Sequence, residues 1–329
     1  MKKISLALTL MVIALTANAQ RMARFVYMDG SDLNGLLANE LVVCAYTESD
    51  NEIERLEKKL AKASGDKKKE LQDEIKKHKA FSEMFNAGLL EMVKANWSLH
   101  ETADLTIMTP DELKASKRGY TMIGVRYLTK QSAYYDPLKV SAGLPVIYLQ
   151  NSGKYGANTD LITMPLIHSQ EVDYNKHDLA LTLKMFVAVV EANKGAKKRV
   201  DVNDVIESMV AKNCNAKSSM ELLVNKETLR GIESKEVRDA YGSKTNVMSE
   251  EEFLAAYMGS EENLAAVCIG ADIAEGTYGP LSVSAVNYCR IVINTVTGEV
   301  YGFANAQVGD KAGEAMFKKG HFSAMGECK

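Results

Sequence analysis

The amino-acid sequence predicts a mixed α/β (α+β) protein made of two tandem βαβαββ-type units with mixed sheets. The main observation is a repeat: residues 105–115 and residues 245–255 each combine a short apolar strand ending near Met, a hydroxyl side chain and a helix. A continuous apolar run, typical of a buried strand, precedes each repeat at residues 41–46 and 222–224. The order strand, helix, strand, helix, strand and hairpin therefore occurs twice.

The helix in each repeat begins with the pattern of a capping box. Thr109 is followed three residues later by Glu112, and Ser249 by Glu252. In this pattern the two side chains satisfy free backbone amides at the helix start. Pro110 suits the first helical position, because its missing N–H has no partner there in any case. The shared position of both boxes after a strand indicates an internal duplication.

The first unit, residues 20–215, carries an insertion near residues 50–79 that the second unit, residues 216–329, lacks. The insertion is dense in Glu, Asp and Lys, with apolar residues at helical spacing and a break at Gly65. We interpret it as a charged helical hairpin on the surface, and the alternative is a protruding arm that contacts a partner. An amphipathic helix at residues 81–97 follows it.

The third strand of each unit is expected at residues 120–128 and 265–273. Both contain an Ile-Gly step, at Gly124 and Gly270, which we align with each other. Glycine inside a strand predicts a bulge or a close backbone approach.

The second unit continues as a predicted β-hairpin. Residues 287–294 form one strand, Thr297 and Gly298 the turn, and residues 299–306 the return strand. A short helix over residues 311–318 is expected to close the unit.

The first unit is more elaborate after its third strand. Strands are expected at residues 144–149 and 161–167, around a Gly-rich loop, and a helix at 201–213. Within residues 179–190, large apolar side chains occupy every second position, which favours a strand, although the length of the segment and its Leu, Met and Ala content also permit a helix: Leu179, Leu181, Leu183, Met185, Val187 and Val189.

The amino-terminal residues have the pattern of a cleavable secretory signal. Lys2 and Lys3 precede the short apolar stretch 4–15, and Ala17 and Ala19 are the small residues that signal peptidase recognises. We expect cleavage after Ala19, no lipid-modified Cys and no integral membrane segment in the processed chain. The protein is therefore expected in the periplasm or outside the cell.

The charge of the processed chain argues against nucleic-acid binding. Removing the two leader lysines from 40 basic residues leaves 38, against 43 acidic residues, for a formal charge of −5. General nucleic-acid binders carry a basic surface instead.

The five cysteines contain no Cys-x-x-Cys pair, which excludes a simple redox or zinc-ribbon motif. Cys268 and Cys289 lie in neighbouring predicted strands and either form a bridge or act, with Cys44, as small buried hydrophobic residues. An odd count leaves one thiol over, which we assign to Cys328; the fifth cysteine is Cys214.

The segment 85–93, followed by residues 105–113, resembles a recurring pattern of envelope proteins in which a helix precedes a strand and an acidic helix start. The pattern is similar to the amino-terminal domain of TolB and the related periplasmic part of CsgG-like proteins. The long charged insertion and the extra strands depart from that family. The resemblance implies a non-catalytic cell-envelope module that binds another protein, and it brings no site residue.

No catalytic, cofactor-binding or metal-binding residue is predicted. The histidines form no H-x-x-x-H pair, and neither a nucleophile elbow nor a P-loop occurs. His168 and His177 bracket a polar loop with Glu171 and Asp173, which a loop-built hydrolase site would need. Four tyrosines in or near loops either line a glycan or peptide surface or pack on their own domain: Tyr134, Tyr135, Tyr148 and Tyr155.

These observations favour an exported, non-catalytic module of the cell envelope that acts in protein–protein interaction or assembly. The expected partner is another envelope protein, and no cofactor is expected. Two alternatives stay open: a secreted hydrolase with a site built from loops, and a small-ligand-binding protein that uses the groove between the two units.

Overall fold

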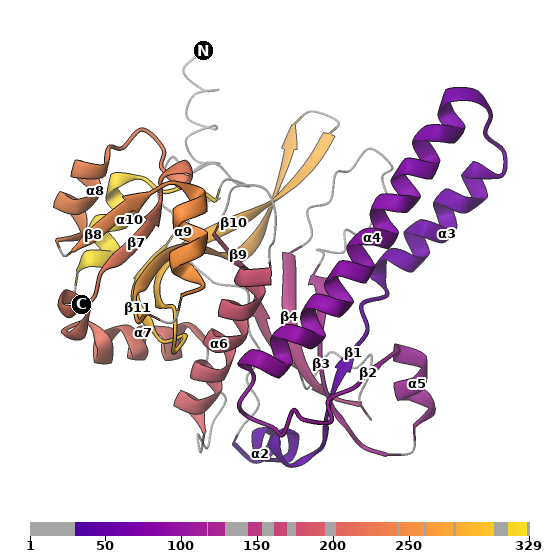
Figure 1. Cartoon of the computed structure of the whole chain (residues 1–329), viewed down its shortest axis with the longest axis horizontal. Coiled ribbons are helices and arrows are strands. Elements are labelled where there is room, and N and C mark those ends of the chain that lie inside the picture. The colour runs from indigo at the N-terminus through magenta and orange to yellow at the C-terminus, as the bar shows by residue number, and fades with distance from the viewer. Residues whose placement is uncertain are drawn as a thin grey trace.

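The computed structural model describes residues 30–116, 118–128, 144–152, 161–169, 176–194, 202–242, 244–259, 261–278, 281–305 and 315–327. The predicted leader, residues 1–19, lies outside them. Figure 1 shows two sheets with helices around them and a helical arm that projects from the first. The architecture is mixed α/β with two mixed sheets, which confirms the predicted fold class.

The first sheet has the strand order β2-β1-β3-β4-β5. β1 runs parallel to both of its neighbours, and the remaining pairs are antiparallel. Parallel neighbours require crossover connections, which the helices α3–α4 and α5 provide. The elements are α2 (Gly30–Ala38), β1 (Leu41–Cys44), α3 (Glu48–Leu60), α4 (Gly65–Asn96), β2 (Ile107–Met108), α5 (Pro110–Ala115), β3 (Thr121–Leu128), β4 (Leu144–Asn151) and β5 (Leu161–Pro165).

The second sheet repeats that order as β8-β7-β9-β10-β11, with β6 added beside β9. β7 is parallel to both β8 and β9, and the strands that follow are antiparallel. The elements are β6 (Ile167–His168), α6 (Lys176–Asn193), α7 (Val202–Asn213), β7 (Leu222–Asn225), α8 (Ser234–Tyr241), β8 (Thr245–Met248), α9 (Glu250–Tyr257), β9 (Leu264–Tyr278), β10 (Leu281–Asn294), β11 (Val300–Ala304) and α10 (Lys319–Gly326), with 3₁₀ turns at Ala216–Ser219 and Lys226–Thr228.

The strand register places the two repeats at equivalent points. Met108 lies opposite Cys44, the last residue of β1, and Met248 lies opposite Asn225, the last residue of β7. Both predicted capping boxes are formed, at the starts of α5 and α9. The sequence repeat therefore corresponds to a repeat in topology.

The predicted alignment of the two Ile-Gly steps is wrong. Leu41 pairs with Thr121 and Leu222 pairs with Leu264, so Gly124 corresponds to Val267 and not to Gly270. The two glycines have separate explanations. A Cβ on Gly124 would lie 2.6 Å from the hydroxyl of Tyr148, whereas Gly270 adjoins a register shift in the β9–β10 pairing.

The insertion and the following amphipathic helix form one arm. The predicted hairpin is present as α3 and α4, but α4 continues for 32 residues without a break and carries the chain back to the sheet. Its far half packs on α3 around a small apolar cluster, and its near half packs on the first sheet. Among the described residues, no helix combines the length and apolar character that a membrane span needs.

Residues 179–190 form the helix α6, so the favoured strand prediction is wrong. Most of the large apolar residues at alternate positions are buried, but intervening residues such as Thr182, Phe186 and Val190 are buried as well. Burial over most of the helix surface leaves only a narrow half-exposed stripe, which includes Ala180, Lys184 and Ala188, so the helical period is weak in the sequence. In Figure 1, α6 lies between the two sheets.

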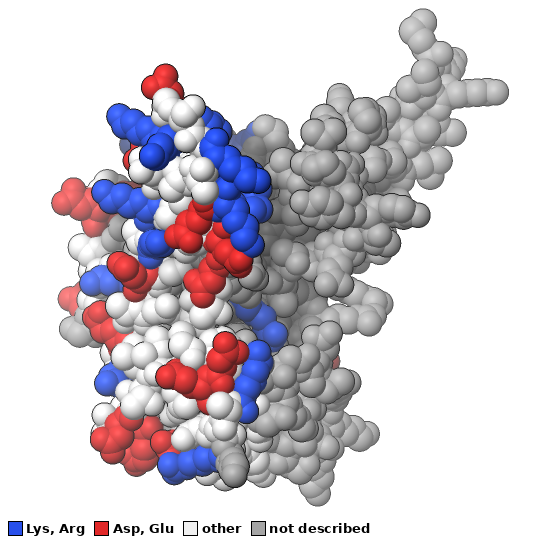
Figure 2. Space-filling model, turned by 90° about the vertical axis from the view of Figure 1, so that its right-hand side faces the viewer, with Lys and Arg blue, Asp and Glu red and all other residues white. Residues whose placement is uncertain are grey.

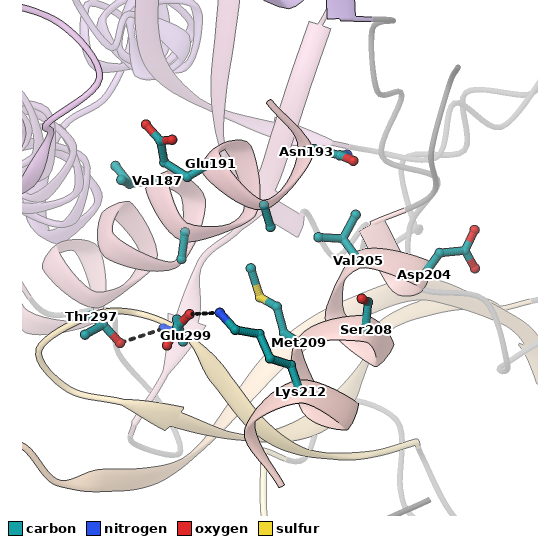
Figure 3. A pocket seen from close by; sticks show the side chains of 12 residues that line it. Val187, Glu191, Asn193, Asp204, Val205, Ser208, Met209, Lys212, Thr297 and Glu299 are labelled. Carbon is teal, nitrogen blue, oxygen red and sulfur yellow. Dashed lines mark hydrogen bonds and ion pairs between the residues drawn. The ribbon is translucent and has the colours of Figure 1, made fainter. Parts of the chain in front are cut away.

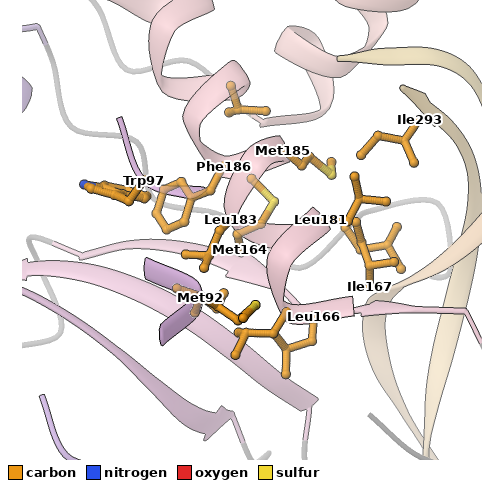
Figure 4. Packing of buried hydrophobic residues seen from close by; sticks show 14 of the residues in the cluster. Met92, Trp97, Met164, Leu166, Ile167, Leu181, Leu183, Met185, Phe186 and Ile293 are labelled. Atoms are coloured by element: carbon orange, nitrogen blue, oxygen red, sulfur yellow. The ribbon is translucent and has the colours of Figure 1, made fainter. Parts of the chain in front are cut away.

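A single apolar core joins the two units around α6. Phe186 packs edge-to-face against Trp97 of the first unit, at 5.5 Å between ring centroids, and the same cluster contains Ile291 and Ile293 of β10. Figure 4 shows the α6 side chains between strands of both sheets.

The two units contribute non-equivalent faces to this shared core. The first unit contributes the face covered by α4, with Val43 and Ile123, and its α5 face with Val42 forms a separate cluster. The second unit contributes the face covered by α9, with Leu223, whereas the face beneath α8 and α10 forms a cluster of its own. In the shared topology α8 corresponds to α4 and α9 to α5. The two units therefore pack head to tail: one contributes its α4 face to the shared core, and the other contributes the face that corresponds to α5.

The end of the chain follows the predicted hairpin. β10 and β11 pair as expected, with Gly298 in the turn at φ +73°. The closing helix is α10, further along the chain than predicted; residues 315–318 are not helical, and most of the predicted range 311–318 lies outside the described residues.

The cysteine alternatives are resolved for the described residues. Cys268 and Cys289 carry thiols and belong to clusters on opposite faces of the sheet, which prevents a bridge. Together with Cys44 they are buried. Cys214 is disulfide-bonded, and its partner lies outside the described residues, as does Cys328.

Candidate functional site

A pocket lies where the two predicted units meet. It has a volume of about 820 Å³ and opens between the last turns of α6, the helix α7 and the turn that joins β10 to β11 (Figure 3). The turn approaches α6 closely: Lys184 Nζ donates a hydrogen bond to the Thr295 carbonyl oxygen at 2.8 Å. The lining residues are Val187, Ala188, Glu191, Ala192, Asn193, Asp204, Val205, Ser208, Met209, Lys212, Thr297 and Glu299.

The charges around this pocket are mainly acidic. Lys212 Nζ lies 3.2 Å from Glu299, and Lys194 forms a pair of the same length with Glu191. Asp204, in the first turn of α7, makes no ion pair with another described residue. One carboxylate is therefore left to interact with a positively charged ligand.

Asn193 belongs to the lining of the pocket, but its amide nitrogen is buried. Its side chain is only 9% exposed, and its Nδ2 has no hydrogen-bond partner among the described residues. A buried donor without a partner is unfavourable by about 1–3 kcal/mol. Because this nitrogen has almost no accessible surface, a ligand seated in the pocket does not reach it.

The lining of the pocket combines apolar side chains with a few polar ones. Its apolar wall is made by residues such as Val205 and Met209, and its only hydroxyls belong to Ser208 and Thr297, with no histidine or cysteine among the lining residues. A pocket with an apolar wall and a few polar groups is suited to binding a small molecule.

The histidines considered for a hydrolase occupy different settings. His168 is buried in β6, where its ring packs edge-to-face on Tyr288 and its Nε2 lies 3.5 Å from the Tyr288 hydroxyl. Burial lowers the pKa of His168 to about 4. His177 is partly exposed in the first turn of α6, and burial followed by the charge of Lys176 lowers its pKa. Glu171 and Asp173 lie outside the described residues.

Tyr148 packs within its own domain. It is 6% exposed, and the guanidinium carbon of Arg126 lies 4.5 Å from the centre of its ring. This arrangement confirms the packing alternative for Tyr148. Tyr134, Tyr135 and Tyr155 lie outside the described residues.

A second group of polar side chains gathers within the arm. Ligand atoms of Glu52, Glu74 and His78 all lie within 4.8 Å of one another, from α3 and α4. This group was not predicted from the sequence because its residues come from two helices, and the only local signal is the i, i+4 spacing of Glu74 and His78. Arg55 already binds Glu52 through Nε and a terminal nitrogen, and these bonds lower the pKa of Glu52. A cation there would have to displace the guanidinium.

The fold and the pocket define a two-unit mixed α/β protein with an acidic pocket at the junction and a charged helical arm. No family model matches the chain, and neither a curated protein nor a solved structure matches it. The resemblance to TolB and CsgG-like domains is therefore an interpretation of the sequence pattern alone.

Proposed function

We propose that this chain is an exported, non-catalytic module of the cell envelope that binds another envelope protein through the β9–β10 hairpin. The observation that carries the proposal is the length of the hairpin, which extends beyond its neighbouring strands. β9 and β10 pair with each other from Leu264 to Tyr278 and from Leu281 to Asn294. Figure 1 shows the outer part of this hairpin projecting from the second sheet.

The outer half of the hairpin has two open edges within the described part of the chain. On one side β9 pairs with β7 and β6 only as far as Ile269. On the other side β10 pairs with β11 only from Arg290 to Ile293. Backbone N–H and C=O groups along both open edges are therefore available to an incoming strand.

An isolated two-stranded ribbon is marginally stable in water, whereas a third strand with a shared face makes a stable sheet. Strand addition to an open edge is a common mode of protein recognition, in which main-chain hydrogen bonds supply the affinity. This argument favours a protein partner for the hairpin.

Two observations support export. The sequence begins with the pattern of a cleavable leader, and Cys214 is disulfide-bonded. Structural disulfides persist in oxidising compartments such as the periplasm and are rare in the cytosol.

The test is cross-linking and affinity capture from envelope extract with the processed chain and two variants. Val283→Lys places a charge on the projecting half of β10 and should abolish capture of the specific partner, because lysine on an open edge opposes strand addition. Val296→Lys is the control, since Val296 is 42% exposed in the β10–β11 turn. Equal capture by both variants would contradict the proposal.

The pocket at the junction supports a second candidate function, the binding of a small organic amine. The specific observation is the exposed carboxylate of Asp204, which makes no ion pair with another described residue. A thermal-shift screen with organic amines and amino acids should find ligands that stabilise the protein. Asp204→Asn should abolish their effect, whereas Glu207→Gln, an exposed change on the same helix, should not.

A further inference from the structure

We propose that the tip of the α3–α4 arm docks on the surface of an anionic phospholipid bilayer. This inference concerns a surface distinct from the hairpin and does not depend on the proposed protein contact. The tip consists of the last turn of α3, the connection and the first turn of α4, residues 58–69. Figure 2 shows the side of the molecule from which the arm projects, and many Lys and Arg side chains lie toward the top of this view.

Charge is separated along the arm. Residues 58–69 contain six lysines and one aspartate, for a formal charge of +5. Residues 48–57, nearer the body, contain five acidic residues and one arginine, for a formal charge of −4. A mixed solvated surface would intersperse the two signs, whereas here the positive charge is collected at the outer end.

Most of the tip lysines are available to an external anion. All six are exposed. Lys58 pairs with Glu54 and Lys67 with Glu70. The other four make no ion pair with any described residue: Lys59, Lys62, Lys68 and Lys69.

The chemistry of the tip favours a lipid surface over a protein partner. The basic residues are all lysine, a compact point charge, with none of the planar arginines that bind carboxylates in pairs. The connecting residues are small, as in Ala61, Ala63 and Ser64, and residues 58–69 contain no aromatic side chain that could anchor a protein interface. Clustered lysines without an anchor are attracted to the field of many lipid headgroups and need no matching pocket.

The arm is built to transmit such a contact to the body. Leu56, Leu71 and Ile75 form a small core between its two helices. α4 runs without interruption from Gly65 to the shared core, which it enters at Phe85. At 1.5 Å per residue, the tip therefore stands about 30 Å from the body along a continuous helix.

The test is co-sedimentation of the processed chain, residues 20–329, with vesicles, so that the apolar leader takes no part. We expect binding to vesicles that contain phosphatidylglycerol and none to pure phosphatidylcholine. The variant K62Q/K68Q/K69Q should bind about 100-fold more weakly, the change that about 1 kcal/mol per lysine gives for three lysines. Raising the salt from 0.1 M to 1 M shortens the screening length from about 10 Å to about 3 Å and should also abolish binding.

The control K226Q/K235Q/K244Q removes the same charge from exposed lysines of the second unit and should bind like the unmodified chain. Far-UV circular dichroism of each variant checks that the arm remains helical. Equal losses in both triple variants would overturn the proposal, because net charge alone would then explain binding. Capture on immobilised polyglutamate without binding to anionic vesicles would overturn it in favour of an acidic protein.

Discussion

A single methyl group added at Gly298 should destabilise the contact between the β10–β11 turn and α6. Gly298 lies in the β10–β11 turn with φ +73°, and a Cβ added there would lie 2.3 Å from the carbonyl carbon of Lys184 in α6. No real Cβ tolerates that distance to backbone, so either the turn or α6 must move. The substitution Gly298→Ala therefore tests whether the turn is seated on α6 as described.

Two effects add in this variant. Placing alanine in the left-handed conformation is unfavourable by about 1–2 kcal/mol, and forcing extra volume into a packed contact by about 1–3 kcal/mol. We therefore expect the free energy of unfolding to fall by about 2–5 kcal/mol. Gly242→Ala is the matched control, because Gly242 has φ +76° and no other heavy atom within 4 Å of the added Cβ.

Urea unfolding followed by fluorescence of Trp97, the single tryptophan, and by far-UV circular dichroism measures both variants. Trp97 packs on Phe186, in the same helix that Gly298 contacts, so its fluorescence reports on α6 directly. The control should lose only the conformational part, about 1–2 kcal/mol. Equal losses in the two variants would refute the seating of the turn on α6.

Buried polar groups and a helix cap give three smaller predictions. Burial lowers the pKa of His168 from an unfolded value of about 6.5 to about 4, so the neutral imidazole contributes its full share to the free energy of unfolding above pH 6.5 and loses about 3 kcal/mol of it as the pH falls to 4. Urea unfolding at both pH values should show that His168→Gln removes this part of the pH dependence. Parallel pH profiles of the two proteins would contradict this prediction. Tyr257→Phe removes the hydroxyl that donates to Asp178 at 3.5 Å in a buried site, and the unfolding midpoint should drop by the equivalent of about 1 kcal/mol; an unchanged midpoint would show that this bond adds nothing. Ser249→Ala removes the side chain that caps α9 and should lower thermal stability by about 1 kcal/mol, which calorimetry can measure; a variant as stable as the parent would mean that solvent satisfies the amide equally well.

The parts of the fold that local chemistry determines could be predicted. The capping boxes at Thr109 and Ser249 depend on residues three positions apart, and both form as expected. The hairpin turn at Gly298 likewise follows from a Thr-Gly pair between alternating strands. Such features need only neighbours in sequence.

The parts of the fold that depend on residues far apart in the sequence could not be predicted. α6 shows a strand-like alternation, and only the presence of a sheet on either side explains why its intervening positions are buried too. The pocket could not be predicted for the same reason, since its walls are the end of α6, the helix α7 and a turn about 100 residues later in the chain. Sequence spacing carries no information on that convergence.

The alignment of Gly124 with Gly270 shows how a residue match can mislead. Each glycine was expected to mark a bulge or a close approach, and each does, but at different positions along equivalent strands. Gly124 makes room for the ring of Tyr148 across β3 and β4. A strand pairing, which sequence alone does not fix, was needed to tell the two apart.

The two units use opposite faces of their equivalent sheets to form the shared core. A position on β1 and its counterpart on β7 occupy the same place in the topology but face opposite surroundings: the side turned toward the middle of the molecule in one copy is turned outward in the other. Corresponding residues of the two units therefore meet different requirements for burial and polarity. The stretch in which the likeness is visible, a strand end followed by a capped helix, depends on residues three positions apart and not on which face of the sheet is buried.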